Sequence, residues 1–308
     1  MIRKTIIALF VLSTFVLISV GQIGPERRIV LLSGNDLLTA KPDGSDLRVV
    51  VKDSVRKADP RWSPDRKKIV YRVAGSKTGN EESHAKLIVI SIEGSRLRDI
   101  PILAMESDGT IVGGMRFVEE SGWLSNAELY AVGSANPYIA EYRILDANTG
   151  REVGGYLGTG FVTCSTKGQV AYVTIGRTES GATTSQIEVN GTAIYSSSIG
   201  KDSIDHLTWS NDCNRLAFTD TGGGAGKFIV MRGAVREAQI PLRAAMLDQL
   251  TIRSAEQAFL LQGARYAVYY DPLTHLLRAN PNLVNKVNQM RIERERVLKK
   301  LGGTSADW

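Results

Sequence analysis

The sequence has 308 residues, of which 43% are hydrophobic, and a formal net charge of +6. This length and composition are sufficient for one sizeable folded core. The positive charge is concentrated at the two ends, with net +4 in residues 281–301 and +2 from Arg3 and Lys4. The part of the chain between them is therefore formally neutral, which argues against a basic nucleic-acid-binding face.

The first segment is a short basic start followed by an apolar run at residues 5–20. Sixteen helical residues span about 24 Å, which is less than the ~30 Å hydrocarbon core of a bilayer. Residues 1–21 are therefore predicted to be a secretory signal peptide cleaved before Gln22, with a retained N-terminal membrane anchor as the alternative. Either interpretation predicts an exported protein, periplasmic or extracellular.

Residues 28–39 then form a predicted hairpin that turns at Gly34 and Asn35. Its two apolar strands would be the outer strands of a sheet. The inner strands of that sheet would have to come from elsewhere in the chain.

The strongest signal is a strand–turn–strand unit at residues 59–71 that recurs at residues 206–218. Trp62 corresponds to Trp209, an offset of 147 residues, which is about three periods of the 40–50 residues typical of propeller blades. Both tryptophans are expected to be buried between blades. Fainter copies of the unit occur at residues 122–130 (one residue shorter), 163–172 and 251–261.

The run Trp-Ser-Pro-Asp at residues 62–65, followed by basic residues and an apolar-aromatic strand, resembles the repeat of TolB-like β-propellers. That family is named for the periplasmic propeller of the bacterial Tol envelope system. The Asp-Gly turn within residues 36–45 is similar to the element that precedes each repeat. The resemblance covers roughly residues 28–272 and implies an all-β propeller, for which we predict six blades, one of them incomplete, with five blades as the alternative.

No catalytic, metal or cofactor site is predicted. Asp65 and Asp212 could be paired carboxylates, but their place in a tight turn explains them as Asx-turn residues. The glycine-rich stretch at residues 221–228 lacks the first glycine and the final hydroxyl of a phosphate loop. The histidines are isolated in sequence and do not have metal-ligand spacing. They are His84, His206 and His275.

Two further motifs have competing interpretations. Cys164 and Cys213 could form a disulfide in an exported chain, but the repeat places them at different hairpin positions of neighbouring blades. A disulfide needs Cα atoms within about 7 Å, so this offset makes the pairing doubtful. Asn190-Gly191 matches a glycosylation sequon, and we prefer to interpret it as a hairpin turn.

Residues 273–308 are predicted to be a C-terminal helical tail, with Asn280 as N-cap and Gly302 as the stop. An apolar stripe predicts that the helix packs as a cap on the propeller, while its basic face predicts a partner-binding or membrane-surface helix as the alternative. The stripe consists of Leu283, Val287, Met290, Val297 and Leu301. The candidate partner surface consists of Arg291, Arg294, Lys299 and Lys300.

The sequence thus predicts a non-enzymatic protein-interaction scaffold of the cell envelope with a protein partner. Because propellers host many unrelated activities, this step from fold to function is an analogy. One alternative is a hydrolase or lyase acting at the mouth of the channel. Another is a small tethered subunit of a membrane complex.

Overall fold

The structure is a computed structural model. It describes residues 27–73, 77–78, 81–82, 86–102, 106–107, 110–111, 117–136, 139–177, 181, 183–197, 203–223, 225–242, 250–255, 258–263, 266–279 and 281–307. The predicted leader at residues 1–21, His84 and the side chain of Leu283 lie outside the described part.

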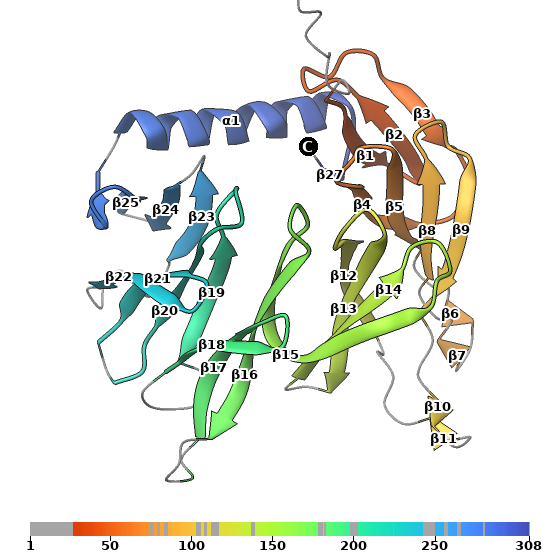
Figure 1. The fold of residues 1–308 in the computed structure, drawn as a ribbon. Helices are drawn as coiled ribbons and strands as arrows, with labels where there is room; N and C mark the ends of the chain where they lie inside the picture. The colour runs from red at the N-terminus through yellow and green to blue at the C-terminus, as the bar shows by residue number, and fades with distance from the viewer. Residues whose placement is uncertain are drawn as a thin grey trace, which may run out of the picture.

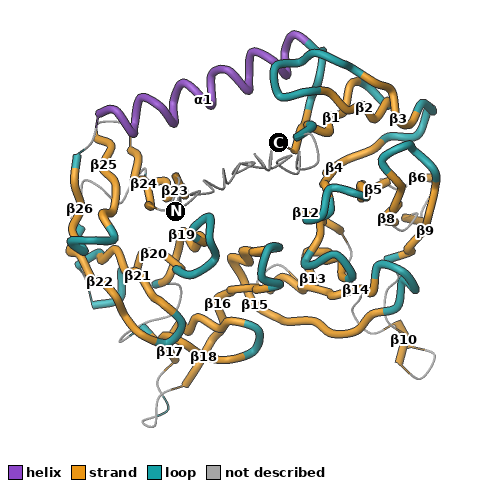
Figure 2. Tube along the Cα trace, turned by 45° about the horizontal axis from the view of Figure 1, so that its top comes forward, coloured by secondary structure: helices purple, strands orange, loops and turns teal. Residues whose placement is uncertain are grey.

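The described chain forms six blades of four antiparallel strands arranged in a ring, with one long strand shared by the third and fourth blades, and one helix (Figures 1 and 2). Blade 1 consists of β27 (Ser305–Asp307), β1 (Ile29–Ser33), β2 (Asp36–Ala40) and β3 (Arg48–Val51). Blade 2 consists of β4 (Lys57–Trp62), β5 (Lys68–Val73), β8 (Lys86–Ser91) and β9 (Arg96–Pro101). Blade 3 consists of β12 (Phe117–Trp123), β13 (Glu128–Asn136), β14 (Ile139–Asp146) and the first half of β15 (Glu152–Cys164).

Blade 4 consists of the second half of β15, β16 (Gln169–Arg177), β17 (Thr183–Val189) and β18 (Thr192–Ser196). Blade 5 consists of β19 (Ile204–Trp209), β20 (Leu216–Asp220), β21 (Lys227–Arg232) and β22 (Val235–Pro241). Blade 6 consists of β23 (Thr251–Ala255), β24 (Ala258–Gly263), β25 (Tyr266–Asp271) and β26 (Leu276–Arg278), and the helix α1 (Pro281–Lys300) follows it. Two small hairpins pair β6 (Lys77–Thr78) with β7 (Glu81–Glu82) and β10 (Glu106–Ser107) with β11 (Thr110–Ile111).

The prediction of a β-propeller with six blades is confirmed, but the first blade is not incomplete. The C-terminal strand β27 pairs with β1, with Leu31 opposite Ala306, and becomes its innermost strand. The hairpin predicted at residues 28–39 therefore supplies the two middle strands, not the outer ones. The tail predicted at residues 273–308 also differs from expectation, because it contributes β26 to blade 6 and β27 to blade 1 as well as the helix.

The Ser-x-Asp turn repeats in blades 2 and 5 with the same hydrogen bonds. Ser63 Oγ donates to Asp65 Oδ1 at 2.6 Å, and Ser210 Oγ donates to Asp212 Oδ1 at 2.5 Å. Burial opposes ionisation of Asp212, but hydrogen bonds from Ser210 and Asn214 lower its pKa to about 2. Both carboxylates are used inside their turns, so the predicted Asx-turn role is confirmed.

Two of the repeat tryptophans tie their blade to the one before it. Trp123 is buried and donates Nε1–H to the carbonyl of Arg61 at 3.2 Å, and Trp209 donates in the same way to Val162 at 3.1 Å. Trp62 is buried as expected. Trp209 is only half-buried, so the expectation of burial is wrong at that position.

A bulge in three inner strands lies three residues before the tryptophan position and is a repeat feature that the sequence analysis missed. Asp59, Gly160 and His206 have φ angles of 49°, 60° and 59°, and the strand register shifts around each of them. Gly, Asp and His are among the residues that tolerate this left-handed conformation. The bulge therefore depends on residue types that differ from blade to blade.

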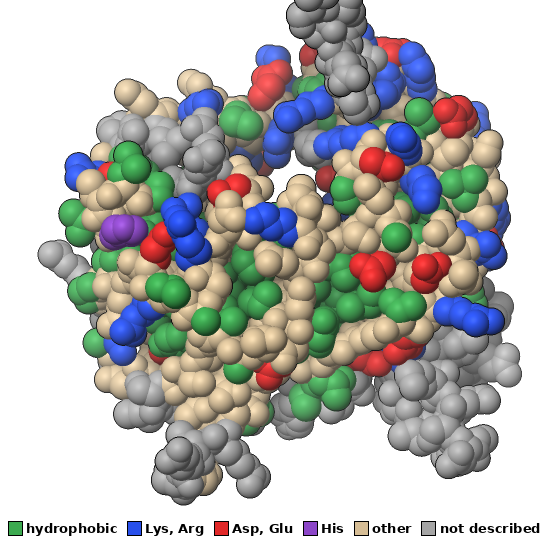
Figure 3. Space-filling view, in the orientation of Figure 1, with side chains coloured by type: hydrophobic (Ala, Val, Ile, Leu, Met, Phe, Trp, Pro, Cys, Tyr) green, Lys and Arg blue, Asp and Glu red, His purple; other side chains and the backbone are tan. Residues whose placement is uncertain are grey.

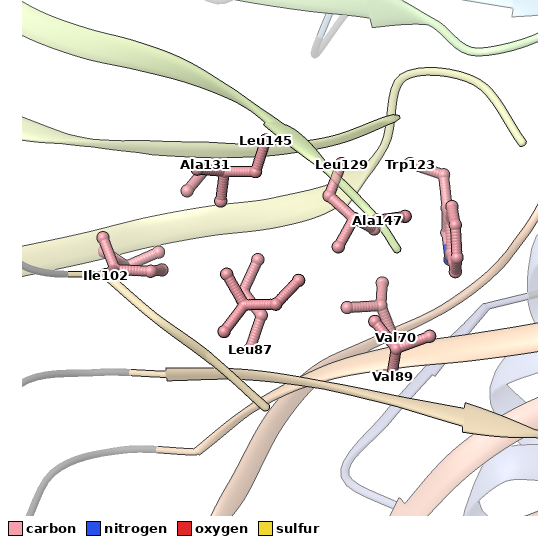
Figure 4. Close-up of a cluster of buried hydrophobic side chains, with 11 residues drawn as sticks. Val70, Leu87, Val89, Ile102, Trp123, Leu129, Ala131, Leu145 and Ala147 are labelled. Atoms are coloured by element: carbon pink, nitrogen blue, oxygen red, sulfur yellow. The ribbon is translucent and has the colours of Figure 1, made fainter. Parts of the chain in front are cut away.

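Five apolar clusters join successive blades from the first to the sixth. Between blades 2 and 3, for example, Val70 and Leu87 pack with Trp123 and Leu129 (Figure 4). The equivalent clusters fill the other four interfaces. Alternation along each strand provides an apolar side chain to both faces of the sheet.

The remaining face of blade 1 is covered by the end of α1. Ile29, Leu31, Leu38 and Ala40 form a cluster with Val297, and Leu298, Leu301 and Ala306 pack against it. In Figures 1 and 2 the helix runs from blade 6 to blade 1, and its 20 residues span about 30 Å. No helix in the described ranges is both long enough and apolar enough to cross a membrane.

The predicted cap is thus confirmed at the C-terminal end of α1 and is wrong in its middle. Val297 is buried and Val287 is half-buried, but Met290 is 48% exposed and does not belong to a packed stripe. The helix ends in a Schellman motif, in which Gly303 N–H donates to Leu298 O and Gly302 has a φ of 64°. This turn directs the chain into β27.

Cys164 and Cys213 form a disulfide between blades 4 and 5, with a Cα–Cα distance of 6.0 Å. The expectation that their offset in the repeat prevents pairing is wrong. Cys213 has a φ of 55° in its turn, as Arg66 (φ 60°) does in the equivalent turn of blade 2. This turn position faces the preceding blade, because Arg66 likewise donates to the carbonyl of Arg28 at 2.8 Å.

Replacing both cysteines with serine should lower the free energy of unfolding by about 2–4 kcal/mol, because the bridge closes a long loop of the unfolded chain. Urea unfolding of the oxidised protein and of the double variant measures this difference. Dithiothreitol should reproduce the loss in the wild type and have no effect on the variant. A difference below about 0.5 kcal/mol would contradict a stabilising bridge.

Val297→Asp should destabilise the protein by about 3 kcal/mol or more, since it places a charge in the apolar cluster between α1 and blade 1. Ile292→Asp is the matched control on the same helix, because Ile292 is 57% exposed, and it should change stability by less than about 0.5 kcal/mol. Thermal and urea unfolding report both values. Equal effects from the two variants would show that α1 does not pack as a cap.

Candidate interaction site

A hollowed surface lies where α1 passes beside the turns of blades 1 and 2, on the side of the turns that follow β2, β4 and β8. Two cavities of about 510 and 490 Å³ lie there and share Arg28 and Arg66 in their walls. We name the pair the arginine trench, after the five arginines that line it. These are Arg27, Arg28, Arg48, Arg66 and Arg294.

The trench has a surplus of positive charge. Its walls contain two carboxylates, Glu93 and Glu293, against the five arginines. Glu293 accepts a hydrogen bond from Arg296 at 2.7 Å, which directs it along the helix surface. In Figure 3, Lys and Arg side chains gather at the upper right, over blade 1 and the C-terminal end of α1.

One edge of the trench is fixed by Asp46. Its carboxylate lies 2.5 Å from Arg28 Nη1 and 2.8 Å from Arg48 Nη2. Hydrogen bonds from Arg48 and then Arg28 lower the pKa of Asp46 to about 2. The carboxylate therefore stays ionised near neutral pH and holds both guanidinium groups in place.

Arg66 lies at the junction of the two cavities, and Trp62 lines the 490 Å³ cavity beside it. The Arg66 guanidinium lies 5.8 Å from the centre of the Trp62 ring and donates to the carbonyl of Arg28. The indole is only 8% exposed, and its Nε1–H has no hydrogen-bond acceptor among the described residues. Trp123 and Trp209, in contrast, donate to the preceding blade.

Apolar side chains lie between the charges. Met290, Val49 and Ile92 line the trench and each keeps roughly half of its side chain exposed. Pro42 adds an apolar surface beside Met290. The arrangement can bind a ligand that combines negative charges with apolar groups.

The structure places only one of the four residues of the predicted partner surface in the trench. Arg294 lines the trench. Arg291, Lys299 and Lys300 are exposed on α1 and are not among the described residues that line the two cavities, and Arg291 lies 3.9 Å from Glu295.

Sequence reasoning missed the arginines supplied by blades 1 and 2. Arg27 and Arg28 precede β1, and Arg66 follows the Pro-Asp turn. These basic residues are visible in the sequence, but no local pattern shows that they lie beside a helix more than 200 residues away.

The two described histidines take part in local hydrogen bonds. His206 Nδ1 lies 3.1 Å from Thr219 Oγ1, and His275 Nδ1 lies 2.8 Å from Tyr270 OH. Within the described ranges, no group of three or more His, Cys, Asp or Glu side chains could hold a metal ion.

Comparison with known proteins gives the fold and nothing finer. No family model and no curated protein matches the sequence. Among solved structures, a eukaryotic initiation factor is 12% identical with a TM-score of 0.52, over 83% of this chain and 63% of that one. The β-propeller domain of the Trilobed protease from Pyrococcus furiosus is 13% identical with a TM-score of 0.48, over 82% of both chains. TolB from Acinetobacter baumannii is 16% identical with a TM-score of 0.41, over 79% of this chain and 60% of that one.

Asp46→Asn should reduce the acid sensitivity of the protein. The pKa of Asp46 is lower in the folded chain than its ordinary value of 3.8, so its ionised form stabilises the fold above that pH, and this contribution is lost as the pH falls towards 2. Melting temperatures measured between pH 5 and pH 2 should therefore fall less steeply in the variant than in the wild type. Parallel curves would show that the contacts of Asp46 with Arg28 and Arg48 do not stabilise the fold.

Proposed function

We propose that this chain is a non-enzymatic β-propeller scaffold of the cell envelope that holds a protein partner on the face where α1 lies against blades 1 and 2. The observation that carries the proposal is the arginine trench, which combines surplus positive charge with exposed apolar side chains in one hollow. Aromatic, Met and Arg side chains are enriched where protein partners bind. The TolB-like repeat of the sequence supports an envelope setting.

The short sequence distance between the predicted leader and Arg27 is compatible with this setting. The described chain begins at Arg27, which itself lines the trench. If residues 1–21 anchor the protein, the five residues between the anchor and Arg27 extend at most about 18 Å. An anchored form would then present the trench close to the membrane surface, where partners from the membrane and from the periplasm or exterior can reach it.

Photo-cross-linking in intact cells tests this function. A benzoylphenylalanine residue in place of Met290 should form a discrete adduct with one partner protein, because this side chain lies in the trench and is exposed. The matched control is the same replacement at Leu273, which is 89% exposed in a blade 6 turn. Absence of an adduct at position 290, or the same adduct at both positions, would contradict a partner site in the trench.

A further inference from the structure

We infer that the arginine trench binds an extended acidic peptide segment with interspersed apolar side chains, an inference that rests on the proposed function and specifies its partner. The trench is lined by the chain entering β1, by β3, by the turns after β2, β4 and β8, and by α1. A ligand that fills both cavities must be elongated, because the two cavities share only Arg28 and Arg66 in their walls. The two cavities, each about 500 Å³, have volumes typical of ligand pockets.

The charges of the trench select carboxylates. Arginine binds a carboxylate through two parallel hydrogen bonds, and such pairs are strong when both groups are partly removed from water. Arg28 and Arg48 are held by Asp46 and define the positive edge. Arg27 and Arg294 are exposed on the wall nearer the helix, where incoming carboxylates can reach them.

A buried donor in the wall of the 490 Å³ cavity adds a group that a peptide can satisfy. Trp62 Nε1–H is buried and lacks an acceptor among the described residues, although the same atom of Trp123 and of Trp209 has one. Leaving a buried donor unpaired is costly, so an acceptor supplied by a ligand gains that energy on binding. Because this N–H is buried in the unbound protein, a peptide carbonyl or side-chain carboxylate reaches it when binding displaces Arg66 or turns the indole.

A membrane surface fits the trench less well than a peptide. The exposed apolar side chains Met290, Val49 and Ile92 lie in the walls of hollows, which a flat bilayer surface does not fill. Helix α1 contains no Trp or Phe that could insert at the headgroup level. An extended strand, in contrast, alternates its side chains and can direct carboxylates and apolar groups to different walls.

The test uses a fluorescein-labelled octapeptide of alternating Glu and Leu, measured by fluorescence anisotropy with the full-length purified protein. The wild type should bind this probe saturably and more weakly as salt rises. A peptide with Gln in place of Glu should bind at least about tenfold more weakly. Absence of saturable binding of the Glu-Leu probe would overturn the inference.

Two charge-reversed variants locate the binding site. Arg27→Glu with Arg294→Glu should weaken binding at least about tenfold while leaving the melting temperature unchanged, because both side chains are exposed. Arg151→Glu with Arg253→Glu makes the same change in net charge on blades 3 and 6, at exposed positions away from the trench, and should bind like the wild type. Equal weakening in both variants would overturn the inference, since it would show binding by net charge alone.

Trp62→Phe tests the buried donor. It keeps an aromatic ring and removes the N–H group, so binding of the probe should weaken roughly 2–10-fold. Unchanged affinity in a folded variant would overturn this part of the inference.

Vesicles that contain phosphatidylglycerol test the membrane alternative. If the protein binds these vesicles through Arg27 and Arg294 but does not bind the peptide, the ligand of the trench is a membrane surface and the acidic-peptide inference is overturned.

The two proposals fail separately. An adduct at position 290 in cells without binding of the Glu-Leu peptide would overturn the acidic-peptide inference and leave the scaffold. Binding of the peptide without any adduct would overturn the envelope scaffold and leave the trench as a peptide site.

Discussion

Six blades in a row form five interfaces if the last blade does not pack directly on the first. The first and the last blade then each have one apolar face that no neighbouring blade covers. On blade 1 that face contains Ile29, Leu31 and Leu38, which would be exposed if nothing packed against them. The chain covers it with the last turns of α1 around Val297, and then adds β27 to the same blade. At about 25 cal/mol per Å² of apolar surface, covering this face is a substantial part of the stability of the first blade.

The arginine trench is a consequence of the same closure. The end of α1 packs on blade 1, while its middle borders an unfilled cavity in whose wall Met290 stays exposed. Arginines from the first two blades and from α1 meet around that space. The candidate site is thus located at the seam of the ring, where elements from the two ends of the chain come together.

Local chemistry explains why much of the fold could be predicted from the sequence. The Ser-x-Asp turns, the aromatic strand after them and the Asn190-Gly191 turn (φ 48° and 79°) are each determined by a few adjacent residues, and the structure has them where the pattern indicates. The same holds for α1, which begins at Pro281 and ends before Gly302. Six blades follow from repeating such local units.

The features that could not be predicted all depend on contacts between distant segments. The partner of β1 lies 275 residues away (Leu31 with Ala306), and three residues of strand carry no signal of their own. The disulfide depended on which way a turn residue faces its neighbouring blade, and the exposure of Met290 depended on the path of the helix. For the trench, the basic face of the helix indicated Arg294. Nothing in the sequence indicated that Arg27 and Arg66 lie beside Arg294.

The long sequence distance between β1 and β27 has a consequence for biosynthesis. A ribosome adds about 5–20 residues per second, so the edge of β1 waits roughly 14–55 seconds for the strand that completes it. During that time residues 29–32, Ile-Val-Leu-Leu, form an apolar strand with unpaired backbone groups, which is a template for pairing with other chains. Until β27 is made, this edge of β1 is open to pairing with other chains, and removal of residues 305–307 would leave it open.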